Sequence, residues 1–424
     1  LTAQTIDVGH IADKFYVSIL GFLPNAGADH VRILTATLLE YLKSLSSAKD
    51  NVLLFGKPEE FVEKCAFRAI IKLGYDSKNA GDNLAYLVAM ALDYFVNPPD
   101  VRNSSRTENK RYLTAGNLLW RGFDGWIKLH ETTERFSEIS KNPELAKQGT
   151  FKTSLWDKHI KLQMKDHKWN IYGTSRHGVV QQLARMSRID TVSQLRRIDV
   201  PREENVATRE MRALDSSHIG SICPAETPDD MDAGIRKHLA MFAMVTTPLI
   251  KPTKIRDQLY ELGHLGVVEE KIFIACKVFI NDIFVDCTNN AEALVKYIRE
   301  MRLDFPDSWK YVSVVELEQS NRVLIRCDAG RMCRPLLRKS AIIQLEKSNI
   351  NIYSMSMNQL IEHKVLEFLD TYEASFALIA IPGETLAESL DITHIELDAL
   401  FIGGLPFSLI PFANTNHVSR DMFQ

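Results

Sequence analysis

The chain has 424 residues, of which 45% are hydrophobic and 25% charged, and its formal net charge is −3. This length supports several domains with cores of their own, and the charge excludes a protein whose whole surface is basic enough to bind a polyanion. A nucleic-acid-binding surface would have to be local or shared with other chains. The six cysteines show no CxxC spacing, so reduced thiols are favoured over a zinc site.

No apolar run reaches the length of a membrane span, and no signal peptide is visible at the N-terminus. These features predict an intracellular, soluble, cytoplasmic protein without a membrane partner. The first hundred residues are patterned as helices over 31–45, 58–73 and 80–96. A polar, proline-containing stretch at 97–109 predicts a linker or surface loop, after which helical patterning returns over 112–139.

Arginine dominates the next region. Between Thr174 and Arg212 the sequence has eight arginines, five acids and no lysine. Planar guanidinium groups suit phosphates and carboxylates. A solvated, salt-bridged helix face is the alternative interpretation, and the residues alone leave both open.

Beyond residue 247 the pattern becomes mixed. Residues 271–286 alternate as a hairpin with Asn281-Asp282 at the turn. A short amphipathic helix is predicted over 291–301, and strands over 311–315 and 322–327. The apolar stretch 401–412 is punctuated by glycine and proline, which predicts a buried loop or strand rather than a helix.

The stretch HIGSICPAETPDD at 218–230 fits neither helix nor strand. Cys223 with His218 as its base is disfavoured as a catalytic pair, because a broken loop does not fix their geometry, and Cys223 is read as a small buried hydrophobe. The acids of this stretch could supply one carboxylate to a metal site, but not a whole cage. No glycine-rich phosphate loop is present.

Arginines also stand beside turn-forming residues at 201–212, 327–336 and 416–420. Backbone and guanidinium donors in such places can converge on phosphates. The sequence alone does not establish that the three groups meet in space.

The stretch 218–230 resembles the H-x-G-x-[IV]-C-P-x-E-T-P-E-G signature of the second-largest (beta-type) subunit of multisubunit DNA-directed RNA polymerases. Further matches occur in the order of the family: NKRYLTAGNLL, the segment SRHGVVQQLARMSRIDTVSQLRR, VFIND, DAGRMCRPL and SLIPFANTNHVSRDMFQ. The resemblance covers about residue 20 to the end. The sequences CPAETP and DAGR are closer to those of eukaryotic and archaeal members, and the divergence of the rest of the chain fits an origin in a virus or large phage.

The resemblance implies an α+β multidomain fold with the lobe, protrusion, fork and external domains of that subunit. The expected ranges are the lobe-like helical region at 1–100, a returning protrusion segment at 101–165, the fork with fork loop 2 at 166–248, the external domains at 249–378, a second fork segment at 379–408 and the start of the hybrid-binding domain at 409–424. On this interpretation the chain is the N-terminal and central portion of a split or truncated subunit.

The resemblance also implies roles for individual residues. Arg420 is expected to contact the phosphates of the incoming nucleotide, and Asp229 to lie beside the catalytic magnesium ions. The loop 201–208 corresponds to fork loop 2, which abuts downstream DNA. The residues expected to bind substrate or nucleic acid are Arg197, Arg202, Arg209, Arg212, Phe423, Arg331 and Arg334. The signature itself contributes His218, Gly220, Cys223, Pro224, Glu226 and Pro228.

By the same resemblance, Mg²⁺ is held mainly by an Asp triad on the largest subunit, and this chain alone binds no metal and has no polymerase activity. The implied partners are the largest (beta-prime-type) subunit, a chain carrying the rest of the beta subunit, template DNA, the RNA transcript and nucleoside triphosphates. Departures from the family are Asp230 in place of glycine, acids at 203–204, and Asp215, which is expected to pair with Arg212. These departures motivate an alternative: a non-catalytic scaffold or nucleic-acid-binding module of the same fold.

Overall fold

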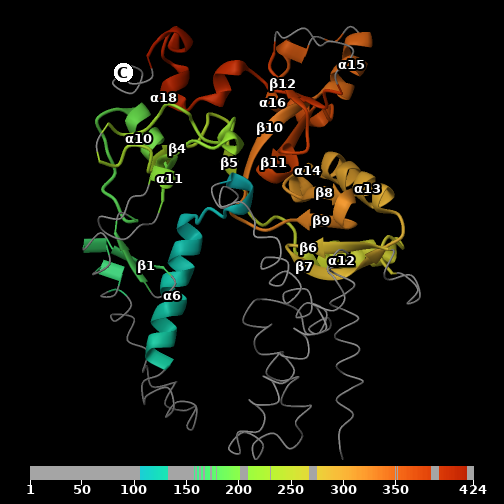
Figure 1. Ribbon diagram of the computed structural model, residues 1–424, viewed down its shortest axis with the longest axis horizontal. Helices are drawn as coiled ribbons and strands as arrows, with labels where there is room; N and C mark the ends of the chain where they lie inside the picture. The colour runs from blue at the N-terminus through green and yellow to red at the C-terminus, as the bar shows by residue number, and fades with distance from the viewer. Residues whose placement is uncertain are drawn as a thin grey trace, which may run out of the picture. The chain divides into compact units, whose positions relative to one another are not determined.

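The computed structural model describes residues 106–131, 157, 160–161, 164–165, 168–171, 174–177, 179–200, 209–229, 231–266, 275–348, 350, 352–382 and 391–417 (Figure 1). The chain divides into two compact units. The first comprises 1–103 and 249–327, and the second comprises 104–248 and 328–424. The division after Cys327 falls inside the range expected for the external domains, so the domain boundaries proposed from the sequence stay predictions.

The described part of the first unit is built on a four-stranded sheet of order β7-β6-β9-β8. Strand β6 pairs antiparallel with β7 and parallel with β9, which pairs antiparallel with β8. The strands are β6 (Cys276–Ile280), β7 (Ile283–Thr288), β8 (Ser313–Leu317) and β9 (Arg322–Arg326). The helical elements are α12 (Pro252–Glu261), α13 (Ala291–Asp304), α14 (Pro306–Trp309) and the 3₁₀ turn η6 (Glu318–Ser320).

The predicted hairpin is confirmed over its described residues. Asn281 and Asp282, which join β6 to β7, have φ values of 52° and 63°. Two successive residues with positive φ are what a type I′ hairpin turn requires, and Asn and Asp tolerate this conformation better than most residues. The predicted helix is also confirmed and extends to Asp304, whereas the strand predicted over 311–315 begins at Ser313.

Apolar side chains form the core of this unit. Leu294 and Ile298 of α13, with Val278 of β6 and Val323 and Ile325 of β9, are completely inaccessible to solvent. Their spacing in the helix is four residues, which places them on one face. Burial of this face against the sheet stabilises the described part of the unit.

The second unit contains a five-stranded sheet, in which β10 is flanked by β11, β13 and the short β5, and β12 pairs parallel with β13. Two-stranded sheets join β1 to β2 and β3 to β4. Its strands are β1 (Lys168–Ile171), β2 (Thr174–His177), β3 (Arg197–Asp199), β4 (Arg236–His238), β5 (Met244–Val245), β10 (Met332–Arg338), β11 (Leu366–Asp370), β12 (Ile379–Ala380) and β13 (His394–Ile395).

The helices of the second unit are mostly short. They are α6 (Ala115–Glu131), α10 (Arg188–Leu195), α11 (Arg209–Arg212), α15 (Lys339–Lys347), α16 (Met357–Glu362), α17 (Thr371–Ala374) and α18 (Leu405–Ser408). Single 3₁₀ turns are η3 (Thr107–Asn109), η4 (Ser216–His218), η7 (Ile352–Ser354), η8 (Ala399–Ile402) and η9 (Ala413–Thr415). Helix α6 confirms the helical pattern predicted over 112–139 as far as Glu131.

The prediction of a buried loop or strand over 401–412 is wrong. The stretch contains the helical turn α18, which has Pro406 in its first turn, where proline is tolerated because no helical N–H is needed there. Leu409 and Phe412 are 59% and 80% exposed. In the part of the chain that the structure describes, no helix combines the length and the hydropathy needed to cross a membrane.

Candidate functional site

The signature stretch begins at a 3₁₀ turn that fixes its first histidine. The Asp215 carboxylate caps η4 by accepting from the Ser217 N–H, and the Asp215 N–H donates to His218 Nδ1 over 3.3 Å. The carbonyl of His218 then accepts from the N–H groups of Ser221 and Ile222. With 5% of its surface exposed, His218 orders the loop rather than offering a base to a substrate.

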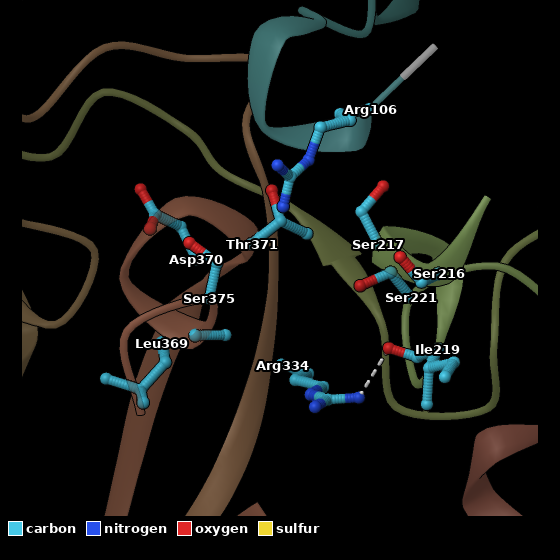
Figure 2. Close-up of a pocket in the computed structure, with 11 residues that line it drawn as sticks. Arg106, Ser216, Ser217, Ile219, Ser221, Arg334, Leu369, Asp370, Thr371 and Ser375 are labelled. Carbon is cyan, nitrogen blue, oxygen red and sulfur yellow. Dashed lines mark hydrogen bonds between the residues drawn. The ribbon is translucent and has the colours of Figure 1, made fainter. Parts of the chain in front are cut away.

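Gly220 is required by a close approach of Arg334. Gly220 has φ +69°, and a Cβ built on it would lie 1.1 Å from Arg334 Nη1. The same Nη1 donates to the Ile219 carbonyl over 2.8 Å, as the dashed line in Figure 2 shows. Arg334 Nη2 pairs with Glu396 Oε1 at 3.0 Å, and both side chains are almost fully buried. One guanidinium therefore connects the signature loop, β10 and the segment after β13.

Cys223 is confirmed as a small buried hydrophobe. It is 3% exposed, and its N–H donates to the His238 carbonyl beside β4. Its Sγ accepts from the N–H of Glu226 over 3.3 Å. Burial raises the pKa of the Cys223 thiol, which disfavours the thiolate needed for nucleophilic catalysis.

Glu226 lies in a cluster of polar side chains from three segments. Ser193 of α10 donates to Glu226 Oε1, and His238 Nδ1 lies 3.0 Å from both that oxygen and Ser193 Oγ. Since Ser193 and Glu226 meet the same nitrogen of His238, the three do not form a proton relay of the Ser-His-acid kind. A Cβ on Gly404 would lie 2.2 Å from Glu226 Oε2, so the segment before α18 also packs against this carboxylate.

Burial governs the protonation of this cluster. It lowers the pKa of His238 to about 4, with the nearby Arg197 charge acting in the same direction. It also raises the pKa of Glu226, against the effects of the Ser193 hydrogen bond and of Arg197 and Arg196. At neutral pH His238 is therefore uncharged, and the cluster holds the loop by hydrogen bonds rather than by a full ion pair.

The second half of the loop is fixed by Thr227. Its hydroxyl donates to the Arg236 carbonyl over 2.9 Å and accepts from the Gly234 N–H over 2.7 Å. Pro224 is exposed and Pro228 is half-buried. Asp229, the next residue, is exposed at the end of this anchored stretch, while Asp230 lies outside the described residues.

The two arginines of the DAGRMCRPL segment do not present free cations to nucleic acid. Arg331 is 3% exposed and pairs with Asp370 at 2.6 Å and with Asp328 at 2.9 Å. Arg334 is bound to Glu396 as described above. Internal carboxylates thus pair with both guanidinium groups, and the expectation that these arginines bind substrate or nucleic acid stays a prediction.

Arg212 does not pair with Asp215. It donates to the carbonyls of Ala233 and Met231, over 2.6 and 2.8 Å, while Asp215 caps η4. Arg197 lies half-buried in β3, and Arg209 begins α11. The loop 201–208 with Arg202, which is expected to be fork loop 2, lies outside the described residues, as do Arg420 and Phe423 near the C-terminus.

Two basic residues that the sequence reasoning missed also anchor this region. Arg196 Nη2 donates to the carbonyls of Ala240, Met241 and Ala243, over 2.6 to 3.0 Å. The buried Lys237 Nζ donates to the Met211 carbonyl, and burial lowers its pKa. The available signal was a Lys-His pair inside the apolar segment 234–249, since charged residues in such a setting require internal partners.

The described residues do not by themselves make a magnesium cage. Among them, no group of three or more histidine, cysteine, aspartate or glutamate side chains is arranged to hold a metal ion. Asp229 is a single exposed carboxylate, and the one acid of the DAGR segment, Asp328, is paired with Arg331 and Arg111. Any metal at Asp229 would need further ligands.

Comparison with known proteins identifies two of these regions. Residues 181–245 match the family model "RNA polymerase Rpb2, domain 3", and residues 278–339 match "RNA polymerase Rpb2, domain 4". The first range holds the signature loop and the Glu226 cluster. The second holds most of the β6–β7 hairpin and all of β10.

Curated relatives cover more of the chain. The DNA-directed RNA polymerase subunit Rpo2 of Sulfolobus acidocaldarius is 25% identical over 91% of this chain and 37% of its own length. The DNA-directed RNA polymerase II subunit RPB2 of Encephalitozoon cuniculi is 29% identical over 59% of this chain and 23% of its own length. The DNA-directed RNA polymerase III subunit RPC2 of Drosophila melanogaster is 25% identical over 74% and 29%. The chain thus spans about a third or less of the length of these relatives, and it is similar to them and to two domains of the RNA polymerase Rpb2 family.

Proposed function

We propose that the chain functions as part of the second-largest subunit of a multisubunit DNA-directed RNA polymerase. The observation that carries this proposal is the signature loop at 218–229, whose sequence resembles the family's signature and whose side chains are internally bonded. Both family-model ranges contain segments that resemble the subunit, and the relatives named above are subunits of such enzymes. The reaction is RNA-chain extension, and the chain is inactive unless assembled.

In this proposal, the chain contributes fork-side and phosphate contacts to an active centre shared with the largest subunit. Arg420 neutralises negative charge on the triphosphate of the incoming nucleotide, which is worth most in the transition state. Magnesium ions held mainly by the largest subunit supply activation of the RNA 3′-hydroxyl and of the leaving pyrophosphate. Asp229 provides one carboxylate beside these magnesium ions.

The bonding of the signature loop gives a physical reason for this role. A carboxylate that approaches metals held by another chain must have a fixed position, or the ordering of the loop would cost free energy on each approach. Thr227 anchors the backbone two residues before Asp229, and the Glu226 cluster anchors it three residues before. We infer that these internal bonds pre-organise Asp229.

The proposal is tested in the assembled enzyme, after co-purification with the other subunits. We expect Arg420→Ala to raise the KM for nucleoside triphosphates at least tenfold while assembly is unchanged, because a charge-assisted contact contributes about 1.5–3 kcal/mol. Arg256→Ala is the matched control, since Arg256 lies on α12 of the first unit, where it pairs with the neighbouring Asp257. An unchanged nucleotide requirement in Arg420→Ala would remove the assigned role.

A non-catalytic scaffold of the same fold is the second candidate. It is favoured by Arg331 and Arg334, which resemble family arginines but are used in internal ion pairs. The two candidates differ in what the chain binds. Co-purification with a largest subunit that carries a magnesium-binding Asp triad, together with RNA synthesis, supports the polymerase. Purification as a lone species supports the scaffold.

A further inference from the structure

A polar pocket lies beside the signature loop, entirely within the second unit. Its volume is about 250 Å³. The walls come from η3, from the start of the signature loop, from β10, and from the end of β11 with α17. Figure 2 shows Arg106 and Arg334 at opposite ends, with serine and threonine side chains between them. Asp229 is not among its lining residues, whereas Arg334 is one of the residues that the resemblance expects to bind substrate or nucleic acid.

Hydrogen-bond donors from several elements line this pocket. Ser221 is 3% exposed and is one of the lining residues. The Nε of Arg334 is buried without a hydrogen-bond partner in the described part of the chain. Ser217 Oγ accepts from the Thr107 N–H, which leaves its own proton available to donate. Buried donors of this kind cost free energy unless a ligand or water satisfies them.

The nearby carboxylates do not meet this demand. Asp370 pairs with Arg331, and its second oxygen accepts from the Glu373 N–H. Glu396 pairs with the far side of Arg334, and Glu108 pairs with Nε of Arg106 at 2.7 Å. The acids are thus used in pairs. Arg106, Ser217 and Ser221 line the pocket beside these pairs, and their side chains supply further donor groups.

We propose that this pocket binds one phosphate group. A phosphate offers several strong acceptor oxygens, and guanidinium and hydroxyl donors are the side chains that bind it. A water molecule occupies roughly 30 Å³ of liquid, so the pocket holds a phosphate together with a few waters. Because the ion pairs leave little net positive charge, we expect weak binding, with a dissociation constant on the order of 1 mM. The inference does not depend on polymerase activity.

The test is a titration of the complete chain with inorganic phosphate, followed by ³¹P NMR or calorimetry at constant ionic strength in chloride. We expect saturable binding. Ser221→Ala should weaken it about fivefold, as loss of one neutral hydrogen bond does, and Arg106→Gln at least tenfold. Arg256→Gln removes a half-buried arginine of the first unit that is also paired with a neighbouring acid, and should leave the affinity within about twofold.

A parallel titration with a nucleoside monophosphate identifies the source of the group. Equal binding of both ligands indicates a phosphate carried on a nucleotide or chain end, and binding of inorganic phosphate alone indicates the free ion. Either result supports the pocket. No saturable binding, or binding that Ser221→Ala and Arg106→Gln leave unchanged, overturns the inference. If Ser221→Ala lowers the melting temperature, the titration is carried out instead with Thr371→Val, which removes a different hydroxyl of the pocket.

These outcomes are separable from those of the proposed function. The titration requires no partner subunit, so its failure leaves the polymerase assignment intact. Conversely, a chain that fails to co-purify with a largest subunit can still bind phosphate in this pocket.

Discussion

The sheet of the first unit and the signature loop of the second unit are ordered by different kinds of interaction. Around β6–β9, apolar side chains from the sheet and from α12 and α13 form one continuous buried cluster. The loop has only a small apolar cluster nearby, built on Ile222, Ala240, Ala243 and Met332. Most of its order comes from directional contacts: the Arg334 guanidinium, the Glu226 cluster and the Thr227 hydroxyl.

This difference predicts different responses to mutation. Apolar burial is roughly proportional to area, so a truncation costs an amount set by the atoms removed and the cavity left. In a polar network the cost of a mutation does not follow the number of atoms removed, because the loss of one partner leaves another buried group without its hydrogen bond. The loop should therefore be sensitive to small changes in shape, and the sheet to changes in volume.

The largest effect is expected for Gly220→Ala. The added methyl group would occupy the place of Arg334 Nη1, and alanine at φ +69° is itself strained by about 1–2 kcal/mol. Displacement of Arg334 would also break its buried pair with Glu396, a loss of about 3–5 kcal/mol. We therefore expect Gly220→Ala to lower the free energy of unfolding by about 5 kcal/mol. Urea unfolding measures this loss, and hydrogen exchange followed in peptides of each unit shows which unit is destabilised.

Gly263→Ala is the matched control for this experiment. Gly263 has φ +70°, but a Cβ there would meet no atom within 4 Å. Its cost should be limited to the backbone term of about 1–2 kcal/mol. Equal destabilisation by the two substitutions would show that the approach of Arg334 is unimportant, and the proposed contrast would fail.

The second-largest effect is expected when a side chain in the sheet core is shortened. Leu294 of α13 is completely buried, so Leu294→Ala should destabilise the first unit by about 3 kcal/mol through lost transfer energy and a residual cavity. Leu262, at the end of α12, is 56% exposed, and Leu262→Ala should cost less than about 1 kcal/mol. Equilibrium urea unfolding gives both values. Similar costs would argue against a packed core.

The Glu226 cluster should make the second unit sensitive to acid. The pKa of His238 is about 4 in the folded chain and 6.5 in the unfolded chain, so the unfolded state binds more protons between these values. The contribution of His238 is therefore complete above pH 6.5 and declines as pH falls toward 4, by about 2 kcal/mol at pH 5.

The raised pKa of Glu226 acts in the opposite direction, because the folded state then takes up a proton that stabilises it as pH falls. The comparison that isolates His238 is the difference in slope between the native chain and His238→Gln, from urea unfolding at pH 7, 6 and 5. We expect a shallower loss of stability with acid in the variant. Parallel slopes would mean that His238 titrates normally in the folded state.

The same contrast explains what the sequence could predict. The hairpin at Asn281-Asp282 and the helix beginning at Ala291 follow from residue periodicity and turn chemistry, which are local. The short strands β5, β12 and β13 have two residues each, and depend on partners distant in sequence. The half-buried α18 turn and the exposed residues that follow it were missed because apolar composition alone does not report burial.

The candidate site shows the same limit. The signature stretch was recognisable as an ordered, non-helical loop, and Cys223 as a buried hydrophobe. The partners of Arg331 and Arg334 were not, because Asp370 and Glu396 lie 39 and 62 residues away and nothing local marks them as counter-charges. Arginine beside turn residues fits both phosphate binding and an internal ion pair, and only the fold decides between them.

The smallest effect concerns a contact that the sequence does reveal. Asn290 is the N-cap of α13, where its Oδ1 accepts from the Ala293 N–H over 3.0 Å. Asn290→Ala removes this acceptor and should cost about 1 kcal/mol, whereas Asn290→Asp retains an acceptor and adds a negative charge at the positive end of the helix, so its stability should stay within about 0.5 kcal/mol. Thermal unfolding with both variants distinguishes them. An equal loss of stability in Asn290→Asp and Asn290→Ala would show that the effect depends on the amide group rather than on helix capping. Even this local interaction would then be one that sequence rules do not predict.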